Sequence, residues 1–434
     1  MQVATLSDWY KSLAVPLLVT GAILAISIGV FSPSAGMLTF ILISFLVLVN
    51  ANLQTAVLLI AALVPFDFQR QIGDSWIYID LAVLPLAFLL LKNRPPLRSF
   101  VLCPFIAWIM IADSLRATEP HVFFTTWIHW LEGAILCCAV AAACVAEEVL
   151  IILGYTLIPL SLYAVYQVAI GDFGDLYRVL NPRWVFDVAW LPGRAYSLMF
   201  GANTFGGFAA LLLVVLFALA VNKIRTNTCV VLSGFGLVGL LCSGSRGGAI
   251  GATVGILFIL ACKRKLLWAL GFSAVLVLVV WAISHVVALP IERMAQSDDF
   301  TVETRLLGFY AGTQAFLSHP IVGIGSTNFI NALYQYVKWP IGDIRSPHNT
   351  YLHLLAENGL FGALLFFAPI AYCFWRAWKH RQQPVMLACL AAIVCSCVHG
   401  LVDFLWMSPQ YGLTMAIFLG ICLMNVSPTP RTQL

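Results

Sequence analysis

Two short segments combine the residue types that bind phosphate. In Ser243-Gly-Ser-Arg246-Gly-Gly248, glycines let the backbone approach a ligand, and an arginine offers the planar fork of donors that suits phosphate oxygens. The second segment is Gly193-Arg194, followed by Ser197 and Gly201-Ala-Asn203, where the start of a helix adds N–H donors that favour an anion. Each segment has a structural alternative: an interfacial arginine in a helix-packing glycine patch for the first, and a capped turn for the second.

A third segment offers a general base. It runs from Ser318-His319-Pro320 and Gly323-Ile-Gly325-Ser-Thr-Asn328 to Ser346-Pro347-His348-Asn349-Thr350-Tyr351. His348 follows a proline at a loop-to-helix junction, where an imidazole can accept a proton near neutral pH. The alternative for a loop histidine is a surface hydrogen bond, and His319 fits that alternative better.

Further candidates remain open between function and structure. Arg305 opens a predicted amphipathic helix over 303–317, and it either binds an anion or pairs with Glu303 or Asp299. His319, Asn349 and Asp299 are weaker candidates for the same site.

Two pairs of ionisable residues have helical spacing within predicted spans. They are His129 with Glu132, and His399 with Asp403. Ionisable groups inside a membrane suggest function, but mutual neutralisation accounts for both pairs equally well.

Composition indicates what kind of scaffold holds these residues. The chain is 61% hydrophobic and only 10% charged, against about 25% charged in soluble domains. A net charge of +4 without a basic tail does not indicate a nucleic-acid partner. No Walker loop follows a strand and no HExxH occurs, and only Asp298-Asp299 weakly resembles a metal-binding carboxylate cluster. We therefore expect no cofactor and no metal.

Hydropathy predicts an all-α integral membrane protein, residues 1–434 forming a single polytopic bundle of 12–14 transmembrane helices. The first apolar run, 13–31, is too long for a signal peptide and is interpreted as the first helix. The runs are 13–31, 36–50, 54–65, 77–91, 100–113, 122–146, 149–170, 204–222, 228–242, 248–262, 266–288, 352–375, 386–404 and 411–426.

Four short basic loops set the predicted orientation. They contain Lys92 to Arg98, Lys223 to Arg225, Lys263 to Lys265, and Arg376 to Arg381. Four, two and two predicted spans separate successive loops, so all four lie on one side, which the positive-inside rule makes cytoplasmic. Both termini then fall inside the cell.

The remaining polar segments must face outward. Two are long: a loop over 171–203 and a large loop over 289–351. Arg194, Arg246, Arg305 and His348 are scattered along the sequence but are all predicted to reach this outer face.

The residues now resemble a known family. Ser243-Gly-Ser-Arg246-Gly-Gly, the run from His319 to Asn328, and Ser346-Pro-His348-Asn-Thr-Tyr-Leu with Glu357-Asn-Gly-Leu look like the O-antigen ligase and O-antigen polymerase superfamily of bacterial inner-membrane glycosyltransferases. The motifs cover about 190–362, and the topology matches over the whole chain. The family's usual Gly-Asn-Pro-Asn turn is present only as Gly201-Ala-Asn-Thr, which makes the role of 194–204 less secure.

The resemblance implies a periplasmic active site and a glycan donor on undecaprenyl diphosphate. It implies an acceptor hydroxyl on lipid A–core for a ligase of lipopolysaccharide biosynthesis, or on a second lipid-linked glycan for a polysaccharide polymerase. By motif position, Arg246, Arg305 and His348 map to the family's catalytic residues, and Arg194 joins the two arginines as a diphosphate ligand. Transfer is expected to be inverting and metal-independent.

Another class also fits part of the sequence. A lipid-linked glycan transporter or flippase would place polar residues near the membrane midplane and show internal repeats. His129 and Glu132 are the pair that such a protein would need, whereas most polar residues gather at the predicted outer rim and no repeat is visible.

Overall fold

The computed structural model describes residues 52–66, 69–72, 75–78, 83–114, 116, 120–170, 194–199, 201–265, 271, 299–337 and 346–425. Within them, six helical segments are long and apolar enough to cross a membrane, and four more apolar helices are shorter. The predicted all-α polytopic membrane fold is confirmed. The predicted spans 13–31 and 36–50, and nearly all of 266–288, lie outside the described residues, so the total of 12–14 stays a prediction.

The first half of the described chain contains five α-helices, one 3-10 helix and a hairpin. The elements are α3 (Leu53–Leu63), β1 (Gln69–Ile72), β2 (Ser75–Tyr78), α4 (Leu86–Asn93), η2 (Leu97–Leu102), α5 (Cys103–Ser114), α6 (Pro120–Ala143) and α7 (Ala146–Ile170). The strands pair antiparallel, with Gln69 opposite Tyr78 and Ile72 opposite Ser75. The run predicted as a span over 77–91 therefore begins as a strand, and its helix starts only at Leu86.

The second half supplies the elements that carry the candidate residues. They are α9 (Ala202–Val221), α10 (Thr226–Ser243), α11 (Arg246–Cys262), α14 (Asp299–Ser318), α15 (Phe329–Tyr336), α16 (Thr350–Lys379), α17 (Pro384–His399) and α18 (Pro409–Leu423). The loop helix predicted over 303–317 is present as α14. α15 was not predicted, and α17 ends five residues before the predicted 404.

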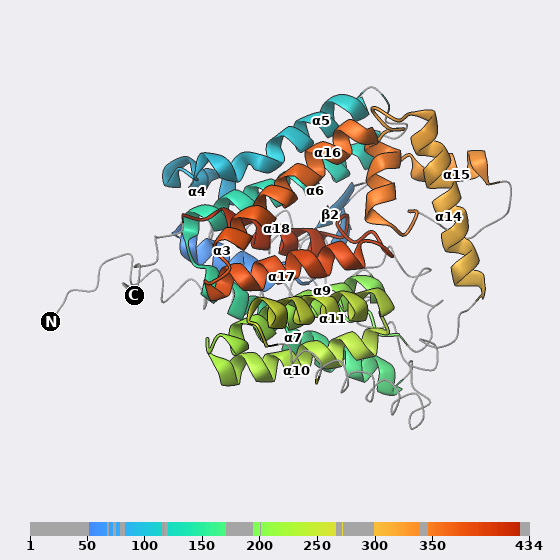
Figure 1. Ribbon diagram of the computed structural model, residues 1–434. Helices are drawn as coiled ribbons and strands as arrows, with labels where there is room; N and C mark the ends of the chain where they lie inside the picture. Colours follow the sequence, from blue (N-terminus) through green and yellow to red (C-terminus); the bar gives the residue numbers. More distant parts are fainter. Residues whose placement is uncertain are drawn as a thin grey trace.

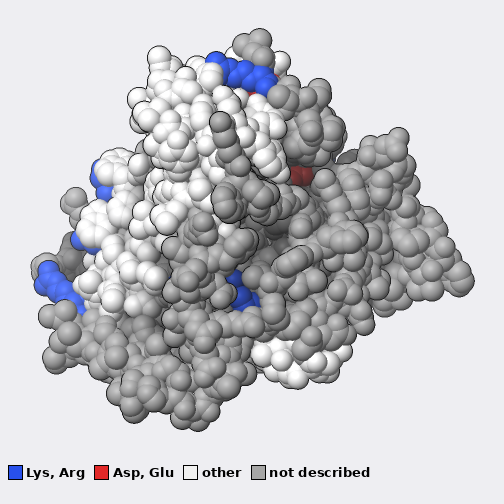
Figure 2. Space-filling model, turned by 90° about the vertical axis from the view of Figure 1, so that its right-hand side faces the viewer, with Lys and Arg blue, Asp and Glu red and all other residues white. Residues whose placement is uncertain are grey.

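The long helices lie side by side, with α9 between α10, α11 and α17 (Figure 1). α9 is apolar and buried on nearly all sides, as expected for a helix that neighbouring helices surround. α14 runs across one end of this bundle, next to α15 and the start of α16 (Figure 1). On the face shown in Figure 2, basic side chains form only a few separate patches among described atoms that are mostly uncharged.

The four basic loops lie at one end of the bundle, here called the basic end. Arg98 and Arg376 both cap the end of α18: Arg98 Nε donates to Leu423 O at 2.6 Å, and Arg376 Nε donates to Cys422 O at 2.9 Å. The third and fourth basic loops are neighbours as well: the Phe258 ring, in the last turns of α11, lies 6.1 Å from the Trp378 ring at the end of α16. At the start of α7, the Arg225 guanidinium lies 3.0 Å from Glu147 Oε1.

The opposite end, here called the site end, is where α7, α10 and α17 finish and α9, α11, α16 and α18 begin. Helices that alternate in direction must return to the same two ends, as the even number of spans between basic loops predicted. Which end faces the cytoplasm stays a prediction from the positive-inside rule.

Glycines bring α11 close to α17. A Cβ on Gly251 would lie only 2.8 Å from the main-chain oxygen of Cys395, and one on Gly247 would lie 2.6 Å from His399 Cδ2. Any larger side chain at Gly251 would push the two backbones apart, as at other small-residue helix contacts in membranes. This contact sets the first turn of α11 against the end of α17.

We predict that Gly251→Val lowers the unfolding midpoint of the detergent-solubilised protein, because overpacking costs about 1–3 kcal/mol. The matched control is Gly234→Val in α10, where a Cβ would meet nothing within 4 Å. Thermal unfolding followed by intrinsic fluorescence measures both variants. Equal midpoints for the two variants would contradict the close contact.

Candidate functional site

Arg194 is held against the end of α10. Its Nε donates to Ser243 O at 2.8 Å, and its Nη2 donates to Asn203 Oδ1 at 2.5 Å. Next to it, Ala195 N donates to Cys242 O at 2.9 Å. The 193–203 and 243–248 motifs, which the sequence shows separately, are thus one structural unit.

Arg246 is the first residue of α11 and is exposed. The helix begins with a Ser245 cap, whose hydroxyl accepts from Gly248 N at 3.2 Å. The partial positive charge of a helix N-terminus therefore adds to the guanidinium charge at this point. Both favour an anion at the site end.

Arg194 lies within electrostatic reach of two further arginines. Burial, the largest cause, and the positive charges of Arg305 and Arg246 lower the pKa of Arg194 to about 10, while the negative charge of Asp403 opposes the shift. The guanidinium of Arg194 stays charged at neutral pH. A cluster of like charges is unfavourable unless an anion joins it, so the arrangement suits a group with more than one negative charge.

His348 lies in front of α16 and faces Asp403. Its Nδ1 is 3.4 Å from Asp403 Oδ1, and its side chain is about one-third exposed at 32%. The backbone of His348 has a φ of 48°, a left-handed conformation that non-glycine residues seldom adopt and that concentrates at functional sites. A carboxylate at Nδ1 holds the proton there and leaves Nε2 as the basic nitrogen.

Asp403 is buried in the loop that joins α17 to α18, residues 400–408, called the α17–α18 loop below. Burial raises the pKa of Asp403, but the His348 hydrogen bond, the charges of His348 and His399, and the bond from Phe404 N lower it more. The net pKa lies below the usual value, so Asp403 is ionised at neutral pH.

The first turn of α16 fixes the α17–α18 loop. Thr350 N donates to Gly400 O at 2.8 Å, and its hydroxyl donates to Asp403 O at 2.9 Å. Asn349 caps α16 by accepting from Leu352 N at 2.8 Å, and its Nδ2 donates to Leu401 O at 2.8 Å. Both ends of the Asn349 amide thus hold structure, which gives this predicted candidate a positioning role.

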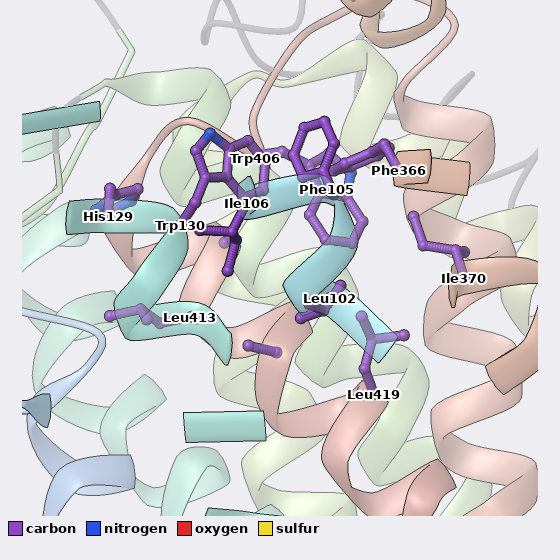
Figure 3. Close-up of a pocket in the computed structure, with 13 residues that line it drawn as sticks. Leu102, Phe105, Ile106, His129, Trp130, Phe366, Ile370, Trp406, Leu413 and Leu419 are labelled. Carbon is purple, nitrogen blue, oxygen red and sulfur yellow. The ribbon is translucent and has the colours of Figure 1, made fainter. Parts of the chain in front are cut away.

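Aromatic packing anchors the other end of the α17–α18 loop. Figure 3 shows Trp406 gathered with Trp130, Phe105 and Phe366 around an apolar cavity of about 20 Å³, room for about one water. The Phe366 ring lies 5.1 Å from Trp406 in an edge-to-face contact, and Phe105 lies 5.1 Å from Trp130. The α17–α18 loop is therefore fixed on both sides of Asp403, by the first turn of α16 and by Trp406.

Two predicted candidates do not join this cluster in the described structure. His319 is exposed at the end of α14, where its Nδ1 lies 3.0 Å from Ser318 Oγ. It is separated from Arg305 by fourteen residues, almost all helical, or roughly 20 Å along α14. Asp299 begins α14, but its side chain lies outside the described residues, as does Glu303, so the predicted salt bridges of Arg305 remain untested.

The structure also adds residues that the sequence did not assign to the site. The sequence paired Asp403 with His399, but Asp403 lies beyond the end of α17 and faces His348, 55 positions away. His399 lies beneath it, 2% exposed, between α11 and Tyr411. One signal in the sequence could have indicated this role: Asp403 follows Gly400 closely and lies next to a segment predicted to face outward.

The comparison with protein families gives a match over 228–367 to the family described as O-antigen ligase. The matched segment runs from α10 through α11, α14 and α15 into α16, and includes Arg246, Arg305 and His348. Residues 228–367 are thus similar to an O-antigen ligase domain. The resemblance noted in the sequence is thereby confirmed. The members of this family are membrane glycosyltransferase-like ligases and polymerases. The comparison with curated proteins finds no match.

We predict a pH-dependent stabilisation by Asp403. Since its folded pKa lies below that of a free carboxyl, about 3.9, the ionised form stabilises the fold at higher pH. That contribution disappears as the pH falls through the lowered folded pKa. Asp403→Asn should therefore lower the unfolding midpoint by a few degrees at pH 6 to 8, with the gap to wild type closing below about pH 4.

Scanning fluorimetry in detergent between pH 3 and pH 8 measures this gap. The control is Glu147→Gln, which removes an exposed pair with Arg225 and should change the midpoint little at any pH. A wild-type to Asp403→Asn gap that widens in acid would show that the sign is wrong.

Proposed function

We propose that this protein transfers a glycan from undecaprenyl diphosphate to a hydroxyl of lipid A–core, on the periplasmic face of the bacterial inner membrane. One observation carries the proposal: a His348–Asp403 pair lies at the same end of the bundle as Arg194, whose guanidinium feels the positive charges of Arg246 and Arg305. Such a site combines a base for a hydroxyl with a cationic cradle for a diphosphate.

The arginines suit the leaving group. When the bond between the anomeric carbon and the phosphate oxygen breaks, its electron pair stays on the diphosphate, and negative charge grows there. Fixed guanidinium groups stabilise that charge as it develops, without reorganising. Arg194 is already held by Ser243 and Asn203, so little conformational freedom is lost when the anion binds.

His348 suits the acceptor. With Asp403 at Nδ1, its Nε2 takes the hydroxyl proton while the hydroxyl oxygen attacks the anomeric carbon. Attack from the face opposite the departing diphosphate inverts the anomeric configuration. This account needs no metal or cofactor, in keeping with the expectation from the sequence.

The sidedness of the site is inferred from the positive-inside rule. The basic end carries the four Lys- and Arg-rich loops, and Arg194, Arg246 and His348 lie at the other end. If the basic end is cytoplasmic by the positive-inside rule, the site is periplasmic and both termini are cytoplasmic.

The same site chemistry serves a polymerase, for which the acceptor hydroxyl belongs to a second undecaprenyl-diphosphate-linked glycan. The acceptor separates the two activities. Reconstituted protein is offered undecaprenyl-diphosphate glycan with lipid A–core or with more of the lipid-linked glycan alone. A glycosylated lipid A–core supports the ligase, a lengthened lipid-linked chain supports the polymerase, and flipping of the donor without any transfer product contradicts both.

We predict that His348→Ala reduces transfer by about 10²–10⁴-fold, because the acceptor proton loses its base. The amount of folded protein in the membrane should stay close to that of wild type. The control is His380→Ala at the basic end, where the side chain follows the last turn of α16. Wild-type transfer by His348→Ala would remove the base from the mechanism.

We predict that Arg246→Lys reduces transfer about 10²-fold, because a point charge does not replace a bidentate guanidinium at a diphosphate. Arg264→Lys at the basic end is the control and should leave transfer unchanged. Initial rates at saturating acceptor measure both variants. An unchanged rate for Arg246→Lys would place the diphosphate elsewhere.

A further inference from the structure

A second histidine lies buried next to the His348–Asp403 pair. His353 is five residues further along, inside the first turns of α16, and only 6% exposed. Its Nε2 lies 3.1 Å from Glu357 Oε2, one helical turn away and equally buried. A buried ionisable pair is costly to build and adds little stability over apolar residues of the same size, so its presence here calls for another explanation.

The imidazole of His353 stacks on the residue next to Asp403. Its ring centroid is 3.9 Å from that of Phe404, with the planes 28° apart. Phe404 N donates to Asp403 Oδ1 at 2.9 Å. Phe404 thus connects the imidazole of His353 to the carboxylate that faces His348.

Glu357 fixes the other edge of the imidazole. Its Oε1 accepts from Phe329 N at 3.2 Å, at the first residue of α15, and its carbonyl accepts from Gly325 N at 2.9 Å. Those bonds form where α16 breaks at Gly359, which has a left-handed φ of 65°. Glycine is required there, because a Cβ would lie only 2.4 Å from the main chain of Ile321. The start of α15 is therefore bound directly to the carboxylate that holds His353.

We propose that His353 is a positioning residue, which through its stack on Phe404 holds Asp403 at hydrogen-bonding distance from His348. The inference rests on the proposed role of His348 as the base. The contact with Glu357 fixes the position of the His353 ring, and the bond from α15 fixes the Glu357 carboxylate. The packing of the 319–336 segment is therefore coupled to the geometry of His348, the proposed base.

The relay predicts an effect on the α17–α18 loop. The ring of Phe404 packs on His353, and the main-chain N–H of Phe404 donates to Asp403 Oδ1. Loss of the stack should therefore let this part of the loop open more often.

Two variants separate the stack from the charge. His353→Ala removes the ring and frees Phe404. The double variant His353→Phe with Glu357→Gln keeps an aromatic ring against Phe404, removes both charges, and leaves an amide oxygen to accept from Phe329 N. A matched control is His380→Ala, at the other end of α16.

The readout is backbone hydrogen exchange in the α17–α18 loop, followed by peptide mass spectrometry on the full chain in detergent. Exchange reports the opening of the loop whether or not the protein transfers a glycan. His353→Ala should speed exchange in this loop about tenfold, while the double variant and His380→Ala keep the wild-type rate. Transfer should fall about tenfold in His353→Ala and less than about threefold in the double variant.

An unchanged exchange rate in His353→Ala would overturn the positioning role, even if less folded protein were obtained. A double variant whose loop exchanges as fast as that of His353→Ala would also overturn it, since the ring would then not hold the loop. If wild-type protein and all variants lack transfer while the exchange rates behave as described, the proposed function fails and the relay stands.

Discussion

The close approach of α9, α11 and α17 is the constraint on which the site depends. Gly247 and Gly251 leave no room for a side chain between α11 and α17, and His399 and the backbone of Cys395 occupy that space. Because the backbones touch there, the first turn of α11 lies next to the α17–α18 loop. Arg246 and Asp403, more than 150 residues apart, thus reach the same end of the bundle. In a membrane, where apolar burial does not drive helices together, contacts of this kind hold a bundle in register.

The charged residues at the site end carry an electrostatic cost that a bound anion would offset. The positive charges of Arg246 and Arg305 act against the buried charge of Arg194, and Asp403 lies buried, with His348 as its hydrogen-bonding partner. The arginines lower the stability of the unliganded protein, because like charges are brought together out of water, whereas ionised Asp403 adds stability through its partners. Proteins tolerate such strain mainly at functional sites, and the left-handed backbone of His348 is a second sign of it. Polyanionic substrate would relieve the repulsion at the moment of binding.

Much of this arrangement could be predicted from the sequence. Among the described residues, hydropathy predicted the membrane helices from 100 onward to within a few residues, since runs of apolar residues in a bilayer have few alternatives to a helix. The even number of spans between basic loops placed Arg194, Arg246, Arg305 and His348 on one face. The hairpin at Gln69–Tyr78 was missed because most of it is a short polar stretch that fits a loop, while its last residues, Ile77 and Tyr78, fit the start of a span.

The partner of His348 could not be predicted, because spacing suggested a local pair between His399 and Asp403. Only the tertiary bonds from Thr350 and Asn349 to the α17–α18 loop turn Asp403 toward His348 instead. The use of Asn349 was missed for the same reason: a capping role and a substrate contact have the same signature in sequence.

The central claim is that the three arginines and His348 form one diphosphate-binding site. The most direct measurement is a cryo-electron microscopy structure of the full chain in nanodiscs with undecaprenyl diphosphate, the leaving group of the proposed reaction. The account predicts diphosphate density within hydrogen-bonding distance of Arg246 and Arg305, on the side of His348 that bears Nε2. Density for the diphosphate at the basic end, or beside His129 and Glu132 in α6, would contradict it.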